Sequence, residues 1–246
     1  MAAETTEDRL LGGRLKLRQP AIGYRAGLDA ALLAAACDAR SGERTLDAGC
    51  GVGAVMLQAA FRAPGAQFLG VERDPTAVDL ARANIQLNGL QDRVRVEVGE
   101  VSARPGGCAG VFDRALANPP FFDDPTALRG PAKAKRGAWL AEGGLEAWTE
   151  FLTKAVRDGG SIVLIHRADR LADLLSLLSR RAGSFAARPV HPFADAPASR
   201  VLVRAVRGGR APLKLLPALV LHPRIGAKHT PEADAILRGE AALDWL

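Results

Sequence analysis

The chain has 246 residues, of which 48% are hydrophobic, 24% charged and 5% aromatic. This apolar fraction suffices for a large core and excludes disordered, collagen-like and fibrous classes. Three cysteines without C-x-x-C spacing argue against a disulfide framework and against a cysteine zinc site, and no metal is expected. No apolar run approaches the ~20 residues that cross a bilayer, and the first residues lack the pattern of a signal peptide. We therefore predict a cytoplasmic protein without a membrane partner, either a monomer or a dimer.

The formal net charge is +6, and the charges are unevenly distributed. Ten cations face a single acid, Asp195, between Arg180 and Lys228. Basic, acid-poor surface attracts polyanions through counterion release, which favours a nucleic-acid partner. A solvated arginine-rich surface would have the same composition. A second acid-poor cluster has four cations, Arg129, Lys133, Lys135 and Arg136.

The chain begins with a strand-like piece at 14–18 and a helical stretch at 27–37, which together are too short to fold alone. We predict that residues 1–40 form an N-terminal segment covering a single domain over residues 41–246. In that domain, short β-branched runs alternate with amphipathic stretches, which is typical of an α/β fold with crossover helices. The predicted strands are 45–48, 67–72, 94–98, 111–117, 161–165, 200–206 and 213–221. One predicted helix follows the first strand and ends at about residue 62. The other predicted helices span 75–88, 145–156, 169–178 and 231–238.

The helix after the second of these strands has clear boundary signals. Asp74 suits the N-cap, Pro75 the first helical position and Gly89 the position just past the end. Its predicted buried face consists of three apolar residues, Val78, Ala81 and Ile85. In the next strand, valines alternate with charged residues, which predicts a half-exposed strand near an edge of the sheet.

A glycine-rich loop follows the first strand of the domain. Asp47 precedes Gly49, Gly51 and Gly53 at a strand-to-helix turn, where glycines permit tight backbone angles and close approach of a ligand. Glu72 ends the next strand, where a carboxylate can accept hydrogen bonds from both hydroxyls of a ribose. The positions of the loop, the helix and Glu72 favour binding of a nucleotide or nucleoside, rather than a turn with a purely structural role. The same pattern also fits an NAD-type oxidoreductase.

The acid directly before the glycines bears on the choice of ligand. A carboxylate at Asp47 would repel a pyrophosphate, but it suits a cationic ligand such as the amino-acid end of S-adenosylmethionine. The alternative is that Asp47 caps the turn through hydrogen bonds to the local backbone.

The tetrapeptide Asn118-Pro119-Pro120-Phe121 follows the fourth strand, at the carboxyl edge where open α/β sheets bind ligands. An exocyclic amine conjugated to a ring is a poor nucleophile, because its lone pair is delocalised. The oxygen of Asn118 and the carbonyl of Pro119 can each accept one amine N–H and so orient that lone pair. Phe121 offers a face on which a planar base or amide stacks. A loop that merely ends a strand would explain the prolines but not Asn118 and Phe121.

These motifs resemble the class I methyltransferases, which use S-adenosylmethionine. The resemblance implies a Rossmann-like α/β fold, with a mostly parallel sheet, helices on both faces and an antiparallel C-terminal edge. It implies that Asp47 and the glycines hold the methionine part of the cofactor and that Glu72 holds the ribose. It places Glu100 near the adenine, although the family commonly has Asp there, and it places Asn118 between cofactor and substrate.

Segments along almost the whole chain, among them ANPPFF and SIVLIHRADRL, are similar to the bacterial tRNA-valine adenine-N6 methyltransferase group. The similarity implies methylation of the 6-amino group of the adenine next to the anticodon. It also implies that four residues pack over the cofactor side, namely Gln19, Tyr24, Arg25 and Asp29.

Several alternatives remain at this point. The same tetrapeptide suits methylation of a glutamine side chain of a translation factor, or of guanine N2 in ribosomal RNA. An oxidoreductase leaves the tetrapeptide without a role, and a non-catalytic RNA-binding module leaves the intact cofactor loop without one. The basic cluster of residues 122–137 either binds RNA phosphates or forms a solvated loop. His166 and Arg167 end a strand at the substrate edge, where a structural histidine is the simpler interpretation, and Trp148 suits the buried face of its helix.

Overall fold

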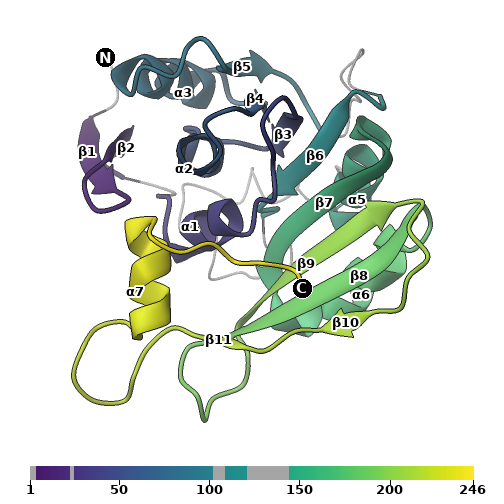
Figure 1. Cartoon of the computed structure of the whole chain (residues 1–246). Coiled ribbons are helices and arrows are strands. Elements are labelled where there is room, and N and C mark those ends of the chain that lie inside the picture. The colour runs from purple at the N-terminus through teal and green to yellow at the C-terminus, as the bar shows by residue number, and fades with distance from the viewer. Residues whose placement is uncertain (1–3, 23–24, 102–108, 121–143) are drawn as a thin grey trace.

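The computed structural model describes residues 4–22, 25–101, 109–120 and 144–246 (Figure 1). Its core is a nine-stranded sheet with the strand order β10-β8-β9-β7-β6-β3-β4-β5, and β11 also pairs with β8. The central strands from β5 to β7 are parallel, whereas β9 is antiparallel to both β7 and β8. The predicted fold, mostly parallel with an antiparallel C-terminal edge, is confirmed. The main strands are β3 (Arg44–Ala48), β4 (Gln67–Glu72), β5 (Val94–Val98), β6 (Phe112–Ala117), β7 (Val156–Arg167), β8 (Ala182–His191) and β9 (Arg200–Arg207).

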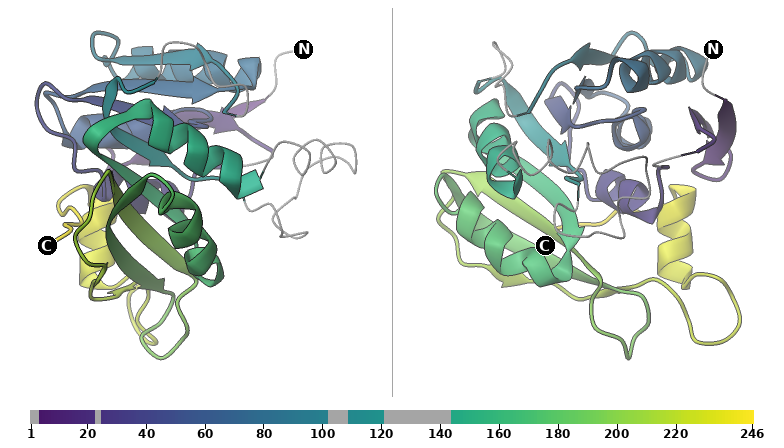
Figure 2. Two further views of the ribbon diagram at one scale, coloured as in Figure 1. Left: turned by 90° about the vertical axis from the view of Figure 1, so that its right-hand side faces the viewer. Right: turned by 180° about the vertical axis from the view of Figure 1, so that it is seen from behind.

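Helices cover both faces of this sheet, and Figure 2 shows two of them, α5 and α6, on the same side. Consecutive residues of β7 belong to two separate apolar clusters, Val163 to one and Leu164 to the other, as expected for strands buried on both faces. One cluster joins the sheet to α1 (Leu28–Ala35), α2 (Ala54–Arg62), α3 (Pro75–Leu87) and α7 (Pro231–Arg238). The other joins it to α5 (Gly144–Ala155) and α6 (Leu171–Leu178), which follows a short 3₁₀ turn. None of the helices in the described residues is long and apolar enough to cross a membrane.

The boundary signals of α3 are confirmed. The side chain of Asp74 accepts a hydrogen bond from the N–H of Thr76, Pro75 is the first helical residue, and Gly89 has φ +64° just past the end. The expected buried face of three apolar residues is buried. The following strand, β5, lies at the edge of the sheet, where Val98 is 56% exposed although the preceding valines are buried.

The C-terminal strands differ from the prediction in two ways. The strand predicted at 213–221 is wrong, since only β10 (Lys214–Leu215) and β11 (Leu219–Val220) pair with β8. Pro217 interrupts the pairing because it has no N–H, and its carbonyl instead accepts a hydrogen bond from Arg188 at 3.0 Å. Strand β8 itself was not predicted. It contains Pro189, which lies between the two short stretches that β10 and β11 pair with.

The N-terminal segment forms a hairpin of β1 (Thr5–Leu10), which was not predicted, and β2 (Leu15–Pro20), which matches the piece expected at 14–18. Asn84 of α3 and Asn88, the residue that caps the end of this helix, serve as hydrogen-bond partners for the outer edge of β2. Asn84 bonds both the N–H and the carbonyl of Arg18, at 2.7 and 2.8 Å. Asn88 does the same for Lys16, at 2.9 and 2.7 Å. These amides satisfy an exposed strand edge and attach the hairpin to the domain.

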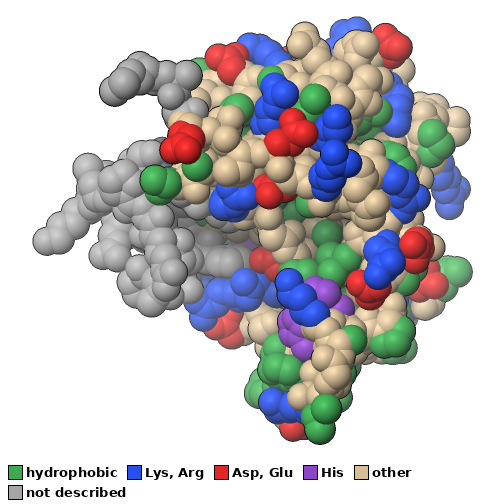
Figure 3. All heavy atoms as spheres, turned by 90° about the vertical axis from the view of Figure 1, so that its left-hand side faces the viewer, with side chains coloured by type: hydrophobic (Ala, Val, Ile, Leu, Met, Phe, Trp, Pro, Cys, Tyr) green, Lys and Arg blue, Asp and Glu red, His purple; other side chains and the backbone are tan. Residues whose placement is uncertain are grey.

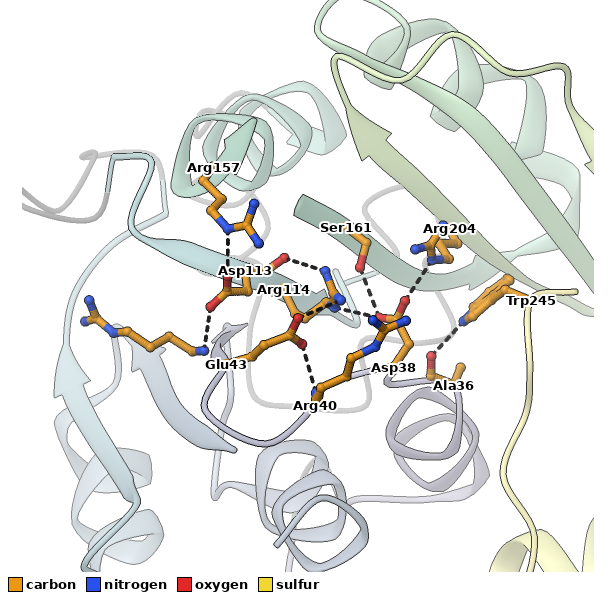
Figure 4. Close-up of polar contacts among 11 residues, drawn as sticks. Ala36, Asp38, Arg40, Glu43, Asp113, Arg114, Arg157, Ser161, Arg204 and Trp245 are labelled. Carbon is orange, nitrogen blue, oxygen red and sulfur yellow. Dashed lines mark hydrogen bonds and ion pairs between the residues drawn. The ribbon is translucent and has the colours of Figure 1, made fainter. Parts of the chain in front are cut away.

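The segment after α1 is attached to the sheet by a charged network centred on Asp38 (Figure 4). Asp38 accepts hydrogen bonds from the hydroxyl of Ser161 and from Nε of Arg204, both at 3.0 Å, and lies 3.2 Å from Nε of Arg114. The Arg114 side chain is only 9% exposed and also pairs with Glu43 at 2.9 Å. A partly shielded carboxylate with two hydrogen-bond donors and a second guanidinium nearby is worth more than an exposed ion pair.

We expect replacement of Arg204 by methionine to lower the free energy of unfolding by about 1–2 kcal/mol, since Asp38 is deprived of one charged partner in a partly buried site. Arg82, which pairs with Asp79 across an exposed helix surface, provides the matched control. Arg82→Met should change the stability by no more than about 0.5 kcal/mol. Urea unfolding of both variants measures the difference. Equal costs for the two variants would show that the shielded network adds nothing.

Candidate active site

The strand register brings the two predicted motifs together at one edge of the sheet. Ala48 at the end of β3 lies opposite Ala117 at the end of β6. The glycine loop and Asn118 therefore leave neighbouring strands, which are about 4.8 Å apart, at the same edge. The end of β4, at Glu72, follows on the other side of β3.

All three glycines of the loop have left-handed backbone angles, with φ values of +64° at Gly49, +55° at Gly51 and +89° at Gly53. The N–H groups of Gly49 and Cys50 both donate to the carbonyl of Val71, at 2.8 and 3.1 Å. These bonds fold the loop back over β4 before α2 begins at Ala54. A Cβ atom at Gly51 would meet no atom of the described residues within 4 Å, so these residues leave this part of the loop uncovered.

Asp47 is 1% exposed and has one satisfied oxygen. Oδ2 accepts a hydrogen bond from the N–H of Met56 at 3.1 Å, so the capping interpretation accounts for this oxygen. Oδ1 is buried without a hydrogen-bond partner in the described part of the chain. Burial raises the pKa of Asp47 to about 8, and the nearby charge of Glu72 adds to the rise, while the Met56 N–H opposes it. A buried carboxyl with a spare oxygen is suited to a cationic partner.

Glu72 connects the glycine loop to the start of α3. Its Oε2 accepts a hydrogen bond from the N–H of Gly51 at 3.0 Å, and its Oε1 accepts one from the N–H of Asp74 at 2.9 Å. Glu100 follows the next strand, β5, and lies 3.9 Å from the guanidinium of Arg73. Since a carboxylate oxygen has two lone pairs, Glu72 keeps acceptor capacity toward a ligand.

Asn118 is half-buried, Pro119 is buried and Pro120 is half-buried. Together with the glycine loop, Glu72 and Glu100, they occupy the ends of four successive strands, β6, β3, β4 and β5. The ends of β6 and β5 are separated by three strand spacings, on the order of 15 Å, so this edge of the sheet suits an extended ligand. The described residues contain no group of three His, Cys, Asp or Glu side chains that could hold a metal ion.

Comparison with known proteins agrees with this geometry. The methyltransferase small domain family matches residues 23–130. A tRNA1(Val) (adenine(37)-N6)-methyltransferase from Porphyromonas gingivalis is 32% identical over 65% of this chain and 66% of its own length. A release factor glutamine methyltransferase from Chlorobaculum tepidum is 29% identical over 60% of this chain and 53% of its own length. The crystal structure of a predicted O-methyltransferase from Agrobacterium tumefaciens covers 87% of this chain and 98% of that protein, with a TM-score of 0.73 and 26% identity.

Residues 23–130 are thus similar to the methyltransferase small domain, and the fold is similar to that of a methyltransferase along almost its whole length. The chain spans just under two thirds of the tRNA methyltransferase and about half of the glutamine methyltransferase. The donor groups at this edge fit S-adenosylmethionine, the cofactor of such methyltransferases. A buried carboxyl at Asp47 suits a cationic amino-acid end, the open face of Gly51 admits a ligand, and Glu72 provides a carboxylate for hydroxyl groups.

Several residues predicted for the site lie outside the described residues. These are Tyr24, Phe121, Arg129, Lys133, Lys135 and Arg136.

Three residues that the resemblance implied over the cofactor side have other contacts in the structure. Gln19 is buried, donates to Asp8 and accepts a hydrogen bond from the N–H of Ala26 at 2.9 Å. Arg25 also donates to Asp8, so that both residues tie the N-terminal hairpin to the chain that follows it. Asp29 forms an ion pair with Arg200 of β9 at 2.9 Å.

His166 lies near the carboxyl end of β7, one position further along its strand than the residue aligned with Asn118, and it is 4% exposed. Burial, together with the neighbouring guanidinium groups of Arg170 and Arg167, lowers the pKa of His166 to about 4. The imidazole is therefore neutral at pH 7, as a buried structural histidine would be.

Trp148, which the sequence assigns to the buried face of its helix rather than to base stacking, also contacts the glycine loop. Its indole lies over Gly49, where an added Cβ would be only 2.3 Å from Cη2 of the ring. The rest of the side chain packs with the apolar cluster under α5, as the helical pattern indicated. The sequence could not predict this contact, because residues 49 and 148 are joined by tertiary packing alone.

We expect Gly49→Ala to lower the free energy of unfolding by roughly 2–4 kcal/mol, through its left-handed backbone and the collision with Trp148. Gly51→Ala has a similar backbone angle but open space around the methyl group, so it should cost only roughly 1–2 kcal/mol. Urea unfolding compares the two variants. In a Trp148→Leu background the difference should shrink, and a difference that persists unchanged would contradict the packing of Trp148 on Gly49.

Proposed function

We propose that this protein transfers the methyl group of S-adenosylmethionine to the exocyclic 6-amino group of an adenine in RNA, and that the adenine is the one next to the anticodon of a valine tRNA. The observation that carries the proposal is the position of Asn118-Pro119-Pro120 directly beside the glycine loop, at the ends of adjacent strands. The name of the Porphyromonas gingivalis relative supports the RNA substrate.

In this proposal the cofactor lies along the four strand ends. Its amino-acid end contacts Asp47 and the loop glycines, Gly49, Gly51 and Gly53, and its ribose hydroxyls donate to Glu72. Glu100 lies on the adenine side, and Asn118 borders both the cofactor and the substrate. The bound cofactor supplies a methyl group made electrophilic by its sulfonium.

The tetrapeptide orients the substrate amine. The side-chain oxygen of Asn118 and the carbonyl of Pro119 each accept one amine N–H, which turns the nitrogen lone pair toward the methyl group. Pro119 has no N–H that would compete for these acceptors. Phe121 stacks on the base. No strong general base is needed, because the amine proton becomes acidic once the nitrogen is alkylated, and the neutral His166 is consistent with this route.

The basic residues supply the RNA contacts. Arg129, Lys133, Lys135 and Arg136 bind phosphates near the target base. Residues 1–40 act as a cover of the single domain at 41–246, and the substrate places the enzyme in the cytoplasm.

Transfer of labelled methyl from S-adenosylmethionine to total tRNA, purified from cells that lack this protein, tests the proposal. After digestion to nucleosides, the label should appear in 6-methyladenosine. Label in a guanosine would point to the rRNA type of reaction, and label in a translation factor instead of RNA would point to glutamine methylation, as in the Chlorobaculum tepidum relative. Either result would overturn the proposed substrate and keep the reaction class.

A further inference from the structure

Two loops far from the cofactor leave the sheet at the same edge as Asn118. In the strand register, Arg200 at the start of β9 lies opposite both Arg167 of β7 and Val190 of β8. Val220 of β11 lies opposite His191, the last residue of β8. The loop of residues 192–199 after β8 and the loop of residues 221–230 after β11 therefore both extend beyond the substrate edge. We call these two loops the C-terminal platform.

Aromatic and imidazole rings pack together within the platform. The ring centroids of Phe193 and His222 are 5.8 Å apart, and those of His222 and His229 are 5.0 Å apart. The guanidinium of Arg224 lies over the Phe193 ring, 4.2 Å from its centroid. Figure 3 shows the histidine side chains gathered on one face of the molecule with basic side chains beside them. A ring cluster with a stacked guanidinium matches the faces that unpaired bases stack on.

Hydrogen bonds give the platform a defined shape. Nδ1 of His222 is 2.6 Å from the carbonyl of Lys228, and Nδ1 of His191 is 2.7 Å from the carbonyl of Ala196. The N–H of His222 donates to the carbonyl of Pro192 at 2.9 Å, which joins the two loops. The platform is therefore a preformed surface, and binding to it requires little ordering of the protein.

The charge of the platform is one-sided. The segment 221–230 contains Arg224 and Lys228, both exposed, and no acid. The acid of the other loop, Asp195, is already paired with Arg224 at 2.7 Å, and the Arg224 side chain is still 59% exposed. Exposed cations next to half-buried rings are complementary to a nucleic-acid strand, whose phosphates and bases alternate.

We propose that the C-terminal platform binds the RNA substrate outside its target nucleotide, with Arg224 and Lys228 on phosphates and the rings of Phe193 and His222 against a base. This inference rests on the proposed function, since it names a second contact surface for the same RNA. Strand β8 is three strand spacings from β6, on the order of 15 Å, and the proposal therefore assigns the platform to RNA outside the target nucleotide. The platform adds affinity for the whole RNA and leaves the chemical step unchanged.

The test compares the double variant Arg224→Ala/Lys228→Ala with the control Arg210→Ala/Lys214→Ala, which removes two exposed cations from the other end of β8 and its flank. Binding of unlabelled total tRNA is measured at several salt concentrations, together with kcat, KM and the affinity for S-adenosylmethionine. The platform variant should bind tRNA roughly tenfold more weakly. The slope of log K against log salt should fall by about 0.7–0.9 for each phosphate that the variant no longer neutralises. Its KM should rise while kcat and cofactor affinity stay at wild-type values.

Two further variants control for disturbance of the loops and separate the effect of stacking from that of charge. Lys228→Ala alone keeps the backbone carbonyl that His222 bonds, so it is not expected to disturb the loop. Phe193→Leu should weaken binding without changing the salt slope, since it removes stacking and no charge.

The outcomes separate this inference from the proposed function. Unchanged tRNA binding by the platform variants, or an equal weakening in the control variant, would overturn the platform while methylation of adenine by the wild type stands. Conversely, weaker RNA binding in the platform variants alone, with no methylation of any tRNA by the wild type, would support the platform and refute the proposed tRNA substrate. An acidic protein that competes with tRNA only in the wild type would overturn the assignment to RNA.

Discussion

Asn118→Ala should lower kcat for adenine methylation by roughly 10²–10³-fold, since the variant lacks the acceptor that holds the amine lone pair in line with the methyl group. The affinity for S-adenosylmethionine should remain close to that of the wild type, because the main partner of this side chain is the amine of the substrate. Single-turnover methyl transfer and calorimetric titration with the cofactor measure the two quantities separately.

A conservative substitution sharpens this prediction. Asn118→Asp keeps an acceptor oxygen at the same place and should retain more activity than Asn118→Ala, which a merely structural role in ending β6 would not explain. If Asn118→Ala kept full activity, the proposed orientation of the amine would be wrong.

Local signals were sufficient to predict most of the parallel half of the fold. The strands β3, β4 and β6 and the capped helix α3 each combine an apolar pattern with a turn or cap residue close in sequence, such as Asp74. Strand β8 could not be predicted, because a proline at position 189 argues against a strand. The structure shows why the proline fits, since it lies between the two short pairing partners of β8.

The candidate site also combines features that the sequence predicts with features that it does not. The glycine loop and the Asn-Pro-Pro turn are contiguous in sequence, so they could be predicted, and their meeting follows from the rule that parallel strands end at one edge. The packing of Trp148 on Gly49 and the pairing of the two platform loops depend on strands and helices distant in sequence. Nothing in the local pattern indicates them.

The structure also shows that the ten cations between residues 180 and 228 do not form one polyanion-binding surface. Half of these cations pair with acids that lie elsewhere in the chain: Arg180, Arg188, Arg200, Arg204 and Arg207. Of these, Arg188 is 8% exposed and holds the C-terminal end at Asp244 rather than facing solvent. Composition alone counts such internal arginines as polyanion-binding surface. The exposed cations of the platform, Arg224 and Lys228, are a smaller and better-placed set.

Asp47 gives the second large effect, and its expected signature is a pH dependence. In the cofactor-free protein, burial raises the pKa of Asp47 to about 8, so its carboxyl is mostly protonated at pH 7. A cationic amino-acid end binds the carboxylate form, and binding therefore releases a proton below pH 8. The affinity for S-adenosylmethionine should rise with pH toward about 8 and fall again above it, where the α-amino group of the ligand loses its own proton. S-adenosylhomocysteine, which has the same amino-acid end, should show the same dependence.

Asp47→Asn should abolish the rise of affinity toward pH 8 and weaken cofactor binding at pH 8 by roughly 10²-fold, as the cation is left without its counter-charge. Although the substitution weakens cofactor binding, it should raise the free energy of unfolding of the cofactor-free protein at pH 8. A carboxyl with a raised pKa in the folded state destabilises the fold increasingly as pH rises from about 4 toward 8, so the cofactor-free Asn variant should be the more stable protein at pH 8. Titration calorimetry between pH 6 and 9 and urea unfolding of the free proteins measure both effects. Wild-type affinity in Asp47→Asn, with the same slope against pH, would remove Asp47 from the cofactor site and leave it as the cap of α2 through Met56.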